Sequence, residues 1–197
     1  MPFHEPPPTL WPRRDVLRTC LAVAGTATGA LSLATPLAVA ADRVAAIPAA
    51  RRESTMRRAI AVAGRNVAYP FGAVITRIAD GHLEAEGVNA SSKNPMLHGE
   101  VAALEDYLHR HGNRDWADMV LYTTAEPCAM CMSALIWAGI GGVVFGTSLA
   151  GLKRAGIDQI DIPAANIVAA SPFWHGELLG GVLASETDRL FMRDRKG

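Results

Sequence analysis

The sequence is short of cysteine and has no excess of charge of either sign. Its 197 residues include three cysteines, which are too few and too unevenly spaced for a disulfide framework. The 19 basic and 19 acidic side chains cancel, so the chain lacks the positive charge expected of a nucleic-acid-binding protein. Half of the residues are hydrophobic, which excludes a disordered chain and is typical of one folded domain of ordinary size.

The first forty residues have the composition of an export signal. Arg13 and Arg14 precede a short, weakly apolar stretch over 20–33, and residues 38–40 have the small side chains of a cleavage site. The paired arginines make this segment resemble a twin-arginine signal, which implies export to the periplasm and membrane contact through the signal alone. A membrane-anchoring helix is the alternative, although Thr, Gly and Pro interrupt the apolar stretch. We therefore expect three parts: a signal over 1–40, a linker over 41–52 and a folded domain over 53–197.

Helical and strand patterns alternate along the rest of the chain. Some segments carry apolar residues at helical spacing, whereas others are short runs rich in Val and Ile. Residues 147–176 give no clear prediction, because Gly, Pro and Asn interrupt them. The alternation predicts a three-layer α/β/α fold with a central mixed or mostly parallel five-stranded sheet. We expect helices over 53–66, 98–110, 128–138 and 183–192, and strands over 71–78, 82–88, 119–124, 143–146 and 178–180.

One histidine and two cysteines have the spacing of a metal site. Cys128 and Cys131 stand three residues apart, so they share one face of a predicted helix, whose N-terminus favours thiolates. Two thiolates and one imidazole, supplied by His98, suit Zn²⁺. Three protein ligands leave a fourth position for water, as in catalytic zinc sites. We therefore predict one zinc ion per chain, bound by His98, Cys128 and Cys131.

Glu100 is the candidate proton carrier beside this metal. A water activated by zinc can attack an electrophilic carbon, and the reaction needs a group that accepts and returns protons. His98 and Glu100 are two residues apart and would diverge by about 200° on a regular helix. Both can face the metal only if His98 lies at the cap, where the preceding loop meets the helix.

Two other interpretations of the cysteine pair stay open. A Cys-x-x-Cys pair in an oxidising compartment is also typical of a periplasmic dithiol redox protein, although no thioredoxin-like context accompanies it here. A purely structural zinc would need a fourth ligand. Four further histidines could supply one, but none has diagnostic spacing: His82, His109, His111 and His175.

His-x-Glu followed by Pro-Cys-x-x-Cys resembles the signature of zinc-dependent nucleobase deaminases. From about 53 to 193 the chain is similar to the cytidine-deaminase-like superfamily, in the branch of guanine deaminases, tRNA adenosine deaminases and fungal cytosine deaminases. The motifs that carry the resemblance are PFGAV at 70–74, HGEVAAL at 98–104 and TAEPCAMC at 124–131. The resemblance implies a hydrolytic deaminase of a small, free aminated heterocycle, and a homodimer.

The resemblance also implies substrate contacts, most of which have a structural alternative. Asn89 corresponds to the residue that contacts the base edge, although Asn also suits a turn at this place. Phe71 and Trp137 match positions where guanine-deaminase-like members carry Phe and Trp, and both residue types are common in cores. The other implied contacts are Ala129 and Asp158.

A guanine-like purine is the substrate that the resemblance favours. Residues 156–159 are similar to a Gly-Phe-acidic-acidic sequence of guanine-type members, but Gln159 replaces the second acidic residue. Residues 98–100 and 122–124 are similar to fungal cytosine deaminases, so a cytosine-type pyrimidine is the alternative. The loop after the fourth predicted strand lacks the Asp and Lys of tRNA-type members, and we expect no nucleic-acid partner.

Overall fold

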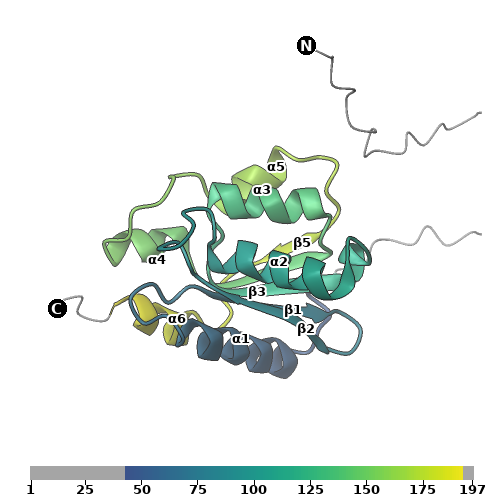
Figure 1. Ribbon diagram of the computed structural model, residues 1–197, viewed down its shortest axis with the longest axis horizontal. Coiled ribbons are helices and arrows are strands. Elements are labelled where there is room, and N and C mark those ends of the chain that lie inside the picture. Colours follow the sequence, from purple (N-terminus) through teal and green to yellow (C-terminus); the bar gives the residue numbers. More distant parts are fainter. Residues whose placement is uncertain (1–42, 193–197) are drawn as a thin grey trace, which may run out of the picture. The chain divides into compact units, whose positions relative to one another are not determined.

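The computed structural model describes residues 43–192, in which helices cover both faces of a five-stranded sheet (Figure 1). This confirms the predicted fold class. The export signal predicted over 1–40 lies outside the described residues. In the part that is described, no helix is both long and apolar enough to cross a membrane. The elements are α1 (Ala49–Ala63), β1 (Gly72–Arg77), β2 (Leu83–Val88), α2 (Gly99–His111), a 3₁₀ turn (Trp116–Asp118), β3 (Met119–Ala125), α3 (Ala129–Ala138), β4 (Gly142–Thr147), α4 (Leu149–Arg154), α5 (Ala164–Ala169), β5 (Glu177–Leu179) and α6 (Ala184–Phe191).

The sheet is mixed, with the strand order β2-β1-β3-β4-β5. β1 pairs antiparallel with β2 and β3, whereas the pairs β3–β4 and β4–β5 are parallel. Every residue of β3 is buried. A strand that is buried on both faces is a continuous apolar run rather than an alternating one, which is why this strand was readily predicted.

Alternate residues of the strands fill two separate cores. Ile75 and Leu121 belong to the core beneath α2 and α3, whereas Val74 and Tyr122 belong to the core beneath α1. Figure 1 shows the same division, with α2, α3 and α5 on one side of the sheet and α1 and α6 on the other. The period-2 geometry of strands produces this division, since successive side chains point to opposite faces.

Two glycines allow helices to lie directly on the β1–β2 hairpin. A Cβ atom on Gly72 would lie 2.4 Å from the backbone nitrogen of Ala63 in α1. A Cβ atom on Gly87 would lie 2.2 Å from the backbone nitrogen of Ala103 in α2. Any side chain at these places would push the helix away from the sheet. Because α2 packs closely on the sheet, the distance between the sheet and the residues at the N-terminus of α2 is fixed.

The folded part begins earlier than the sequence indicated. The first helix begins at Ala49, not at residue 53, and the side chain of Val44 is completely buried. The carboxylate of Glu177 in β5 accepts hydrogen bonds from the backbone N–H groups of Val44 (2.9 Å) and Ala45 (3.1 Å). Residues 44–52 are therefore part of the packed domain, whereas we expected a linker over 41–52.

The segment without a clear prediction, 147–176, contains two helices of six residues each, α4 and α5. Such short helices depend on their caps and tertiary contacts, because isolated turns are unstable. Glu126 supplies one contact to each: its carboxylate accepts from the backbone N–H of Leu149 (2.7 Å) and of Ala164 (2.8 Å). Glu126 immediately follows β3, so one side chain ties both helices to the end of the sheet.

Candidate active site

The N-termini of two helices meet beyond the carboxyl end of β3. His98 immediately precedes α2, Cys128 immediately precedes α3, and both have extended backbone with ψ values of 164° and 167°. Cys131 lies in the first turn of α3 and Glu100 in the first turn of α2. The prediction that His98 lies at the helix cap is confirmed. The cap position lets His98 and Glu100 approach the same point despite their spacing of two.

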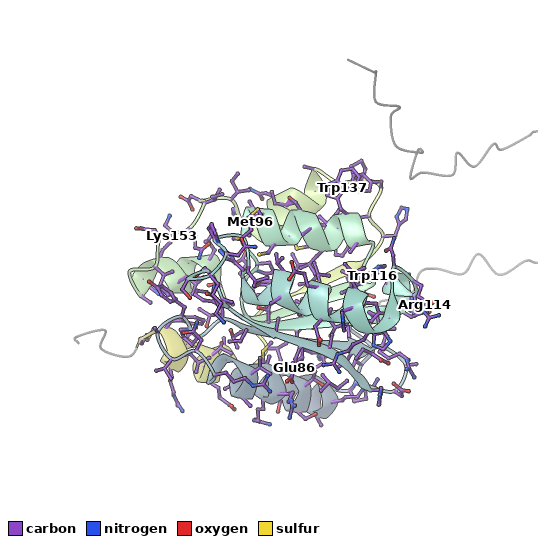
Figure 2. The ribbon with its side chains drawn as sticks, viewed as in Figure 1. Glu86, Met96, Arg114, Trp116, Trp137 and Lys153 are labelled. Carbon is purple, nitrogen blue, oxygen red and sulfur yellow. The ribbon has the colours of Figure 1, made fainter. Side chains whose placement is uncertain are left out.

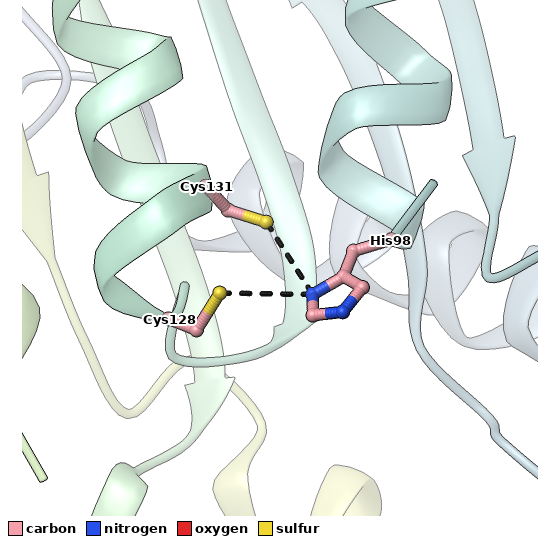
Figure 3. Close-up of side chains that lie close together, drawn as sticks. All are labelled: His98, Cys128 and Cys131. Atoms are coloured by element: carbon pink, nitrogen blue, oxygen red, sulfur yellow. Dashed lines mark hydrogen bonds between the residues drawn. The ribbon is translucent and has the colours of Figure 1, made fainter. Parts of the chain in front are cut away.

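His98, Cys128 and Cys131 bring three donor atoms together in the geometry of a zinc site (Figure 3). Nδ1 of His98 lies 3.6 Å from Sγ of Cys128 and 3.6 Å from Sγ of Cys131. Zn–S bonds of about 2.3 Å and Zn–N bonds of about 2.0 Å at a tetrahedral angle place S and N about 3.5 Å apart, close to these distances. A single ring nitrogen cannot direct one hydrogen at both sulfurs. The three residues therefore fit a zinc ion.

The zinc group has three protein ligands, as predicted for a catalytic site. The three donor atoms lie within 4.8 Å of one another, and no fourth His, Cys, Asp or Glu of residues 43–192 joins them. A structural zinc would need that fourth ligand. His98 and Cys128 also line a cavity, so a metal ion held by these residues would be reached from it.

The two thiols have different electrostatic environments. The hydrogen bond from Cys131, together with that from His98, outweighs burial and lowers the pKa of Cys128 to about 4. The same hydrogen bond to Cys128, with burial, raises the pKa of Cys131. Contact with Cys128 also raises the pKa of His98. Both cysteines are free. The lowered pKa of Cys128 favours a thiolate where a metal cation would bind.

Glu100 is a buried carboxyl group beside the metal ligands. Its side chain is 3% exposed, and Oε1 accepts a hydrogen bond from Oγ1 of Thr123 on β3 (2.9 Å). Burial raises the pKa of Glu100, with a further contribution from Cys128. A raised pKa brings a carboxyl group closer to the range in which it can both accept and donate a proton. Thr123 was not predicted, although its position in β3 two residues after the core residue Leu121 indicates the same face.

A cavity of about 580 Å³ extends from the zinc ligands to the protein surface. This volume is within the range of sites for small molecules and is large enough for one or two rings. Of the predicted substrate contacts, three line the cavity: Phe71, Asn89 and Asp158. The lining also includes residues that sequence reasoning did not assign to substrate: Tyr69, Ser91, Pro95, Glu126, Met130 and Ile160. Their residue types carry no signal of a ligand role.

Asn89 forms the predicted turn and also lines the cavity. Asn89 directly follows β2, is 6% exposed, and lines the cavity. Its Oδ1 accepts hydrogen bonds from the backbone N–H of Ser91 (3.0 Å) and from Oγ of Ser91 (2.8 Å). This is the Asx turn expected of a turn asparagine. The turn fixes the side chain in place at the wall of the cavity.

Two predicted substrate contacts do not line the cavity of this chain. Trp137 lies near the C-terminal end of α3, is 64% exposed, and packs against Phe173 with ring centroids 5.2 Å apart (Figure 2). A helix rises about 1.5 Å per residue, so Trp137 lies about 13 Å along the axis from Cys128. Within one chain, Trp137 is therefore too far along the helix to contact a ligand beside Cys128, and the prediction that it does so is wrong. Ala129 is not part of the lining either, and the neighbouring Met130 takes that place.

Comparisons with known proteins agree with this geometry. Residues 49–147 match the family described as the cytidine and deoxycytidylate deaminase zinc-binding region. The chain is 35% identical over 124 residues to guanine deaminase of Bacillus subtilis, covering 57% of this chain and 78% of that protein. It is 35% identical over 80 residues to a probable cytosine deaminase of Schizosaccharomyces pombe, covering 41% of this chain and 48% of that protein. The solved guanine deaminase of Nitrosomonas europaea superposes with a TM-score of 0.64 at 24% identity, over 71% of this chain and 81% of that one.

Proposed function

The chain belongs to the family of the cytidine and deoxycytidylate deaminase zinc-binding region, and from this premise we propose that it hydrolytically deaminates a free guanine-like base. The observation that carries the proposal is the buried carboxyl of Glu100 beside the three zinc ligands, at the inner end of a cavity of about 580 Å³. The 35% identity to the guanine deaminase of Bacillus subtilis supports a purine.

The reaction replaces an exocyclic amine on a ring carbon by oxygen and releases ammonia. A zinc ion held by His98, Cys128 and Cys131 would make a water molecule acidic enough to lose a proton near neutral pH and so become a nucleophile. Glu100 accepts a proton from the attacking water and delivers it to a ring nitrogen. Glu100 then takes the remaining proton from the oxygen added to the ring carbon and passes it to the leaving amine, so the C–N bond breaks, the carbonyl forms and ammonia leaves. The hydrogen bond from Thr123 to Oε1 keeps this carboxyl aimed at the reacting atoms.

The walls of the cavity favour one small, flat ligand. Phe71 lines it and packs at a tilt of 43° against Phe191, with ring centroids 5.0 Å apart, which fixes an aromatic surface. Met130 and Ile160 add apolar surface, and Asn89 adds a polar group. Apolar walls that also carry polar groups are typical of a site that orients a planar heterocycle. Cytosine is the second candidate, since the fungal relative carries that name.

Measurement of zinc and of ammonia release tests the proposal. The purified chain is expected to hold about one zinc per molecule and to release ammonia from guanine faster than from cytosine, adenine or their nucleosides. Glu100→Gln is expected to retain zinc and to lose about 10³-fold in kcat. Glu105→Gln is the matched control, because Glu105 lies exposed on the same helix. Full turnover by metal-free protein or by Glu100→Gln would overturn the proposal.

We also propose export of the folded enzyme through the twin-arginine-like segment, a view supported by Arg13 and Arg14 and by the small residues over 38–40. A fusion of residues 1–45 to a reporter is expected to reach the periplasm, and Arg13→Lys with Arg14→Lys is expected to retain it in the cytoplasm. We propose further that the enzyme is a homodimer, as its family resemblance implies. Light scattering of the zinc-loaded chain measures that mass directly.

A further inference from the structure

Asn89 has hydrogen-bond partners at every polar group except the NH₂ group of its side-chain amide. The backbone N–H donates to the carbonyl of Phe71 (2.9 Å), and the backbone carbonyl accepts from Nδ2 of Asn66 (2.8 Å). Oδ1 accepts from the backbone N–H and from Oγ of Ser91. Within residues 43–192, Nδ2 has no hydrogen-bond partner, and it is not sealed from solvent. This NH₂ group is therefore the one that Asn89 presents to the cavity that it lines.

Ser91 determines which end of the Asn89 amide faces the cavity. A backbone N–H can only donate, so the side-chain atom 3.0 Å from the nitrogen of Ser91 must be the acceptor Oδ1. The reversed amide would set an NH₂ group against this donor. The hydroxyl of Ser91 adds a second donor at 2.8 Å and increases the preference for the same orientation.

The same loop fixes Asn89 relative to the zinc ligands. The backbone N–H of Ala90 donates to the carbonyl of Leu97 (2.9 Å), which directly precedes His98. This hydrogen bond closes the loop over 90–97 at its base, so Asn89 and His98 lie at its two ends. The closure fixes the distance between the Asn89 NH₂ group and the zinc ligand His98. It therefore also fixes where this NH₂ group lies relative to a ligand bound beside His98.

We propose that Ser91 is a positioning residue: it holds the side-chain amide of Asn89, the residue that the family resemblance already assigns to the base edge, with its NH₂ group toward the cavity, so that the ring edge that meets Asn89 must carry a hydrogen-bond acceptor. The acceptor is a carbonyl oxygen or an unprotonated ring nitrogen. A ring with N–H or C–H at that place leaves the NH₂ group of Asn89 unpaired and binds more weakly. This inference rests on the proposed function, because it assumes that the ligand is an aminated heterocycle.

Calorimetry of ligand binding tests the selection rule without turnover. The full, zinc-loaded chain carrying Glu100→Gln is titrated with guanine and with three analogues. 7-Deazaguanine and 3-deazaguanine each lack one ring-nitrogen acceptor, whereas 2-aminopurine lacks the O6 acceptor and has an unprotonated N1 in place of N1–H. One analogue is expected to bind about tenfold more weakly than guanine, as for the loss of one good hydrogen bond. Adding Asn89→Ala should reduce that difference to less than about twofold, because the NH₂ group that donates to the acceptor is gone. Adding Asn89→Asp should weaken guanine further than Asn89→Ala, because an acceptor then faces an acceptor.

Variants of Ser91 test its positioning role separately. Ser91→Ala removes one of the two donors to Oδ1 and is expected to weaken guanine about threefold, with no change for the analogue that lacks the matching acceptor. Ser91→Thr keeps the hydroxyl and is expected to restore guanine binding. A merely structural role of Ser91 would weaken all four ligands equally.

The outcomes separate this inference from the function on which it rests. If guanine binds but no analogue shows a difference that depends on Asn89, the selection rule is wrong and the proposed function stands. If Ser91→Ala affects guanine and every analogue alike, the positioning role is wrong. If no purine binds and cytosine does not bind either, both the selection rule and the proposed function are overturned.

Discussion

The two ends of the cavity are built differently. At the inner end, His98, Cys128, Cys131 and Glu100 come from the first turns or caps of two helices that pack on the sheet, and Cys131 and Glu100 are buried. At the outer end, the lining comes from the loop between α4 and α5, where Asp158 is exposed and Ile160 is 58% exposed. Helices therefore hold the catalytic groups and the metal ligands. An irregular loop lines the part of the cavity that is far from them.

This difference separates the bond-breaking chemistry from the choice of substrate. A zinc ligand that shifts by a fraction of an ångström loses its bond, so its place must be fixed by packed helices. A loop can change sequence and shape without disturbing the metal, which makes it suitable for specificity. Substitutions at the inner end are therefore expected to reduce kcat, and those at the outer end are expected to change the preference between bases.

The largest effect is expected at Cys131. Cys131→Ser should abolish zinc binding and lower activity by more than about 10³-fold, because the buried hydroxyl is a poor replacement for a thiolate ligand. Metal analysis and ammonia release measure the two effects on the same sample. Ser133→Ala is the matched control in α3; it removes only a hydrogen bond from Oγ to the carbonyl of Ala129 (2.7 Å). Normal zinc content in Cys131→Ser would remove this residue from the site.

A smaller effect at the same end is expected for Thr123. Thr123→Val keeps the shape but removes the hydrogen bond of 2.9 Å to Glu100, and kcat should fall about tenfold with little change in KM or zinc content. Thr123→Ser retains the hydroxyl and should recover most of the rate. Equal kinetics for Thr123→Val and the parent enzyme would show that Glu100 does not need this partner.

The inner end could be predicted from the sequence and the outer end could not. The spacing of His98, Glu100, Cys128 and Cys131 translates directly into helix geometry, since caps and first turns have fixed directions. Thr123 escaped prediction because its partner lies 23 residues away and is defined only by the pairing of layers. Tyr69, Met130 and Ile160 have residue types that serve equally in cores and pockets.

The start of the domain and the short helices were also beyond sequence reasoning. Val44 is buried by contacts that include Glu177, which lies more than 130 residues away in the chain. α4 and α5 each have six residues, too few to show helical periodicity, and they depend on the carboxylate of Glu126. In each case a distant side chain determines a local structure.

At the outer end, Gln159 and Ile160 are expected to influence substrate preference with little effect on the chemistry. Gln159→Glu adds a negative charge to the cavity wall, and Ile160→Ala removes apolar surface that is 58% exposed. Each should change KM by about threefold to tenfold and alter the guanine-to-cytosine ratio of kcat/KM, since contacts in this loop act on binding. Zinc content should stay at that of the parent enzyme. A loss of zinc or a 100-fold fall in kcat in either variant would contradict the division between the two ends.

The smallest effect on activity is expected for Trp137, the predicted substrate contact that lies outside the cavity. Its ring is 64% exposed and its described ring contact is with Phe173, so within one chain Trp137→Ala removes nothing that touches the ligand. The value of kcat/KM should change by less than about twofold, because the substitution alters a surface far from the reacting atoms. Light scattering on the same variant shows whether the exposed pair takes part in the proposed dimer. A fall in kcat/KM of more than fivefold at unchanged mass would mean that Trp137 reaches the cavity of a second subunit, and the comparison between inner and outer ends would then extend across two chains.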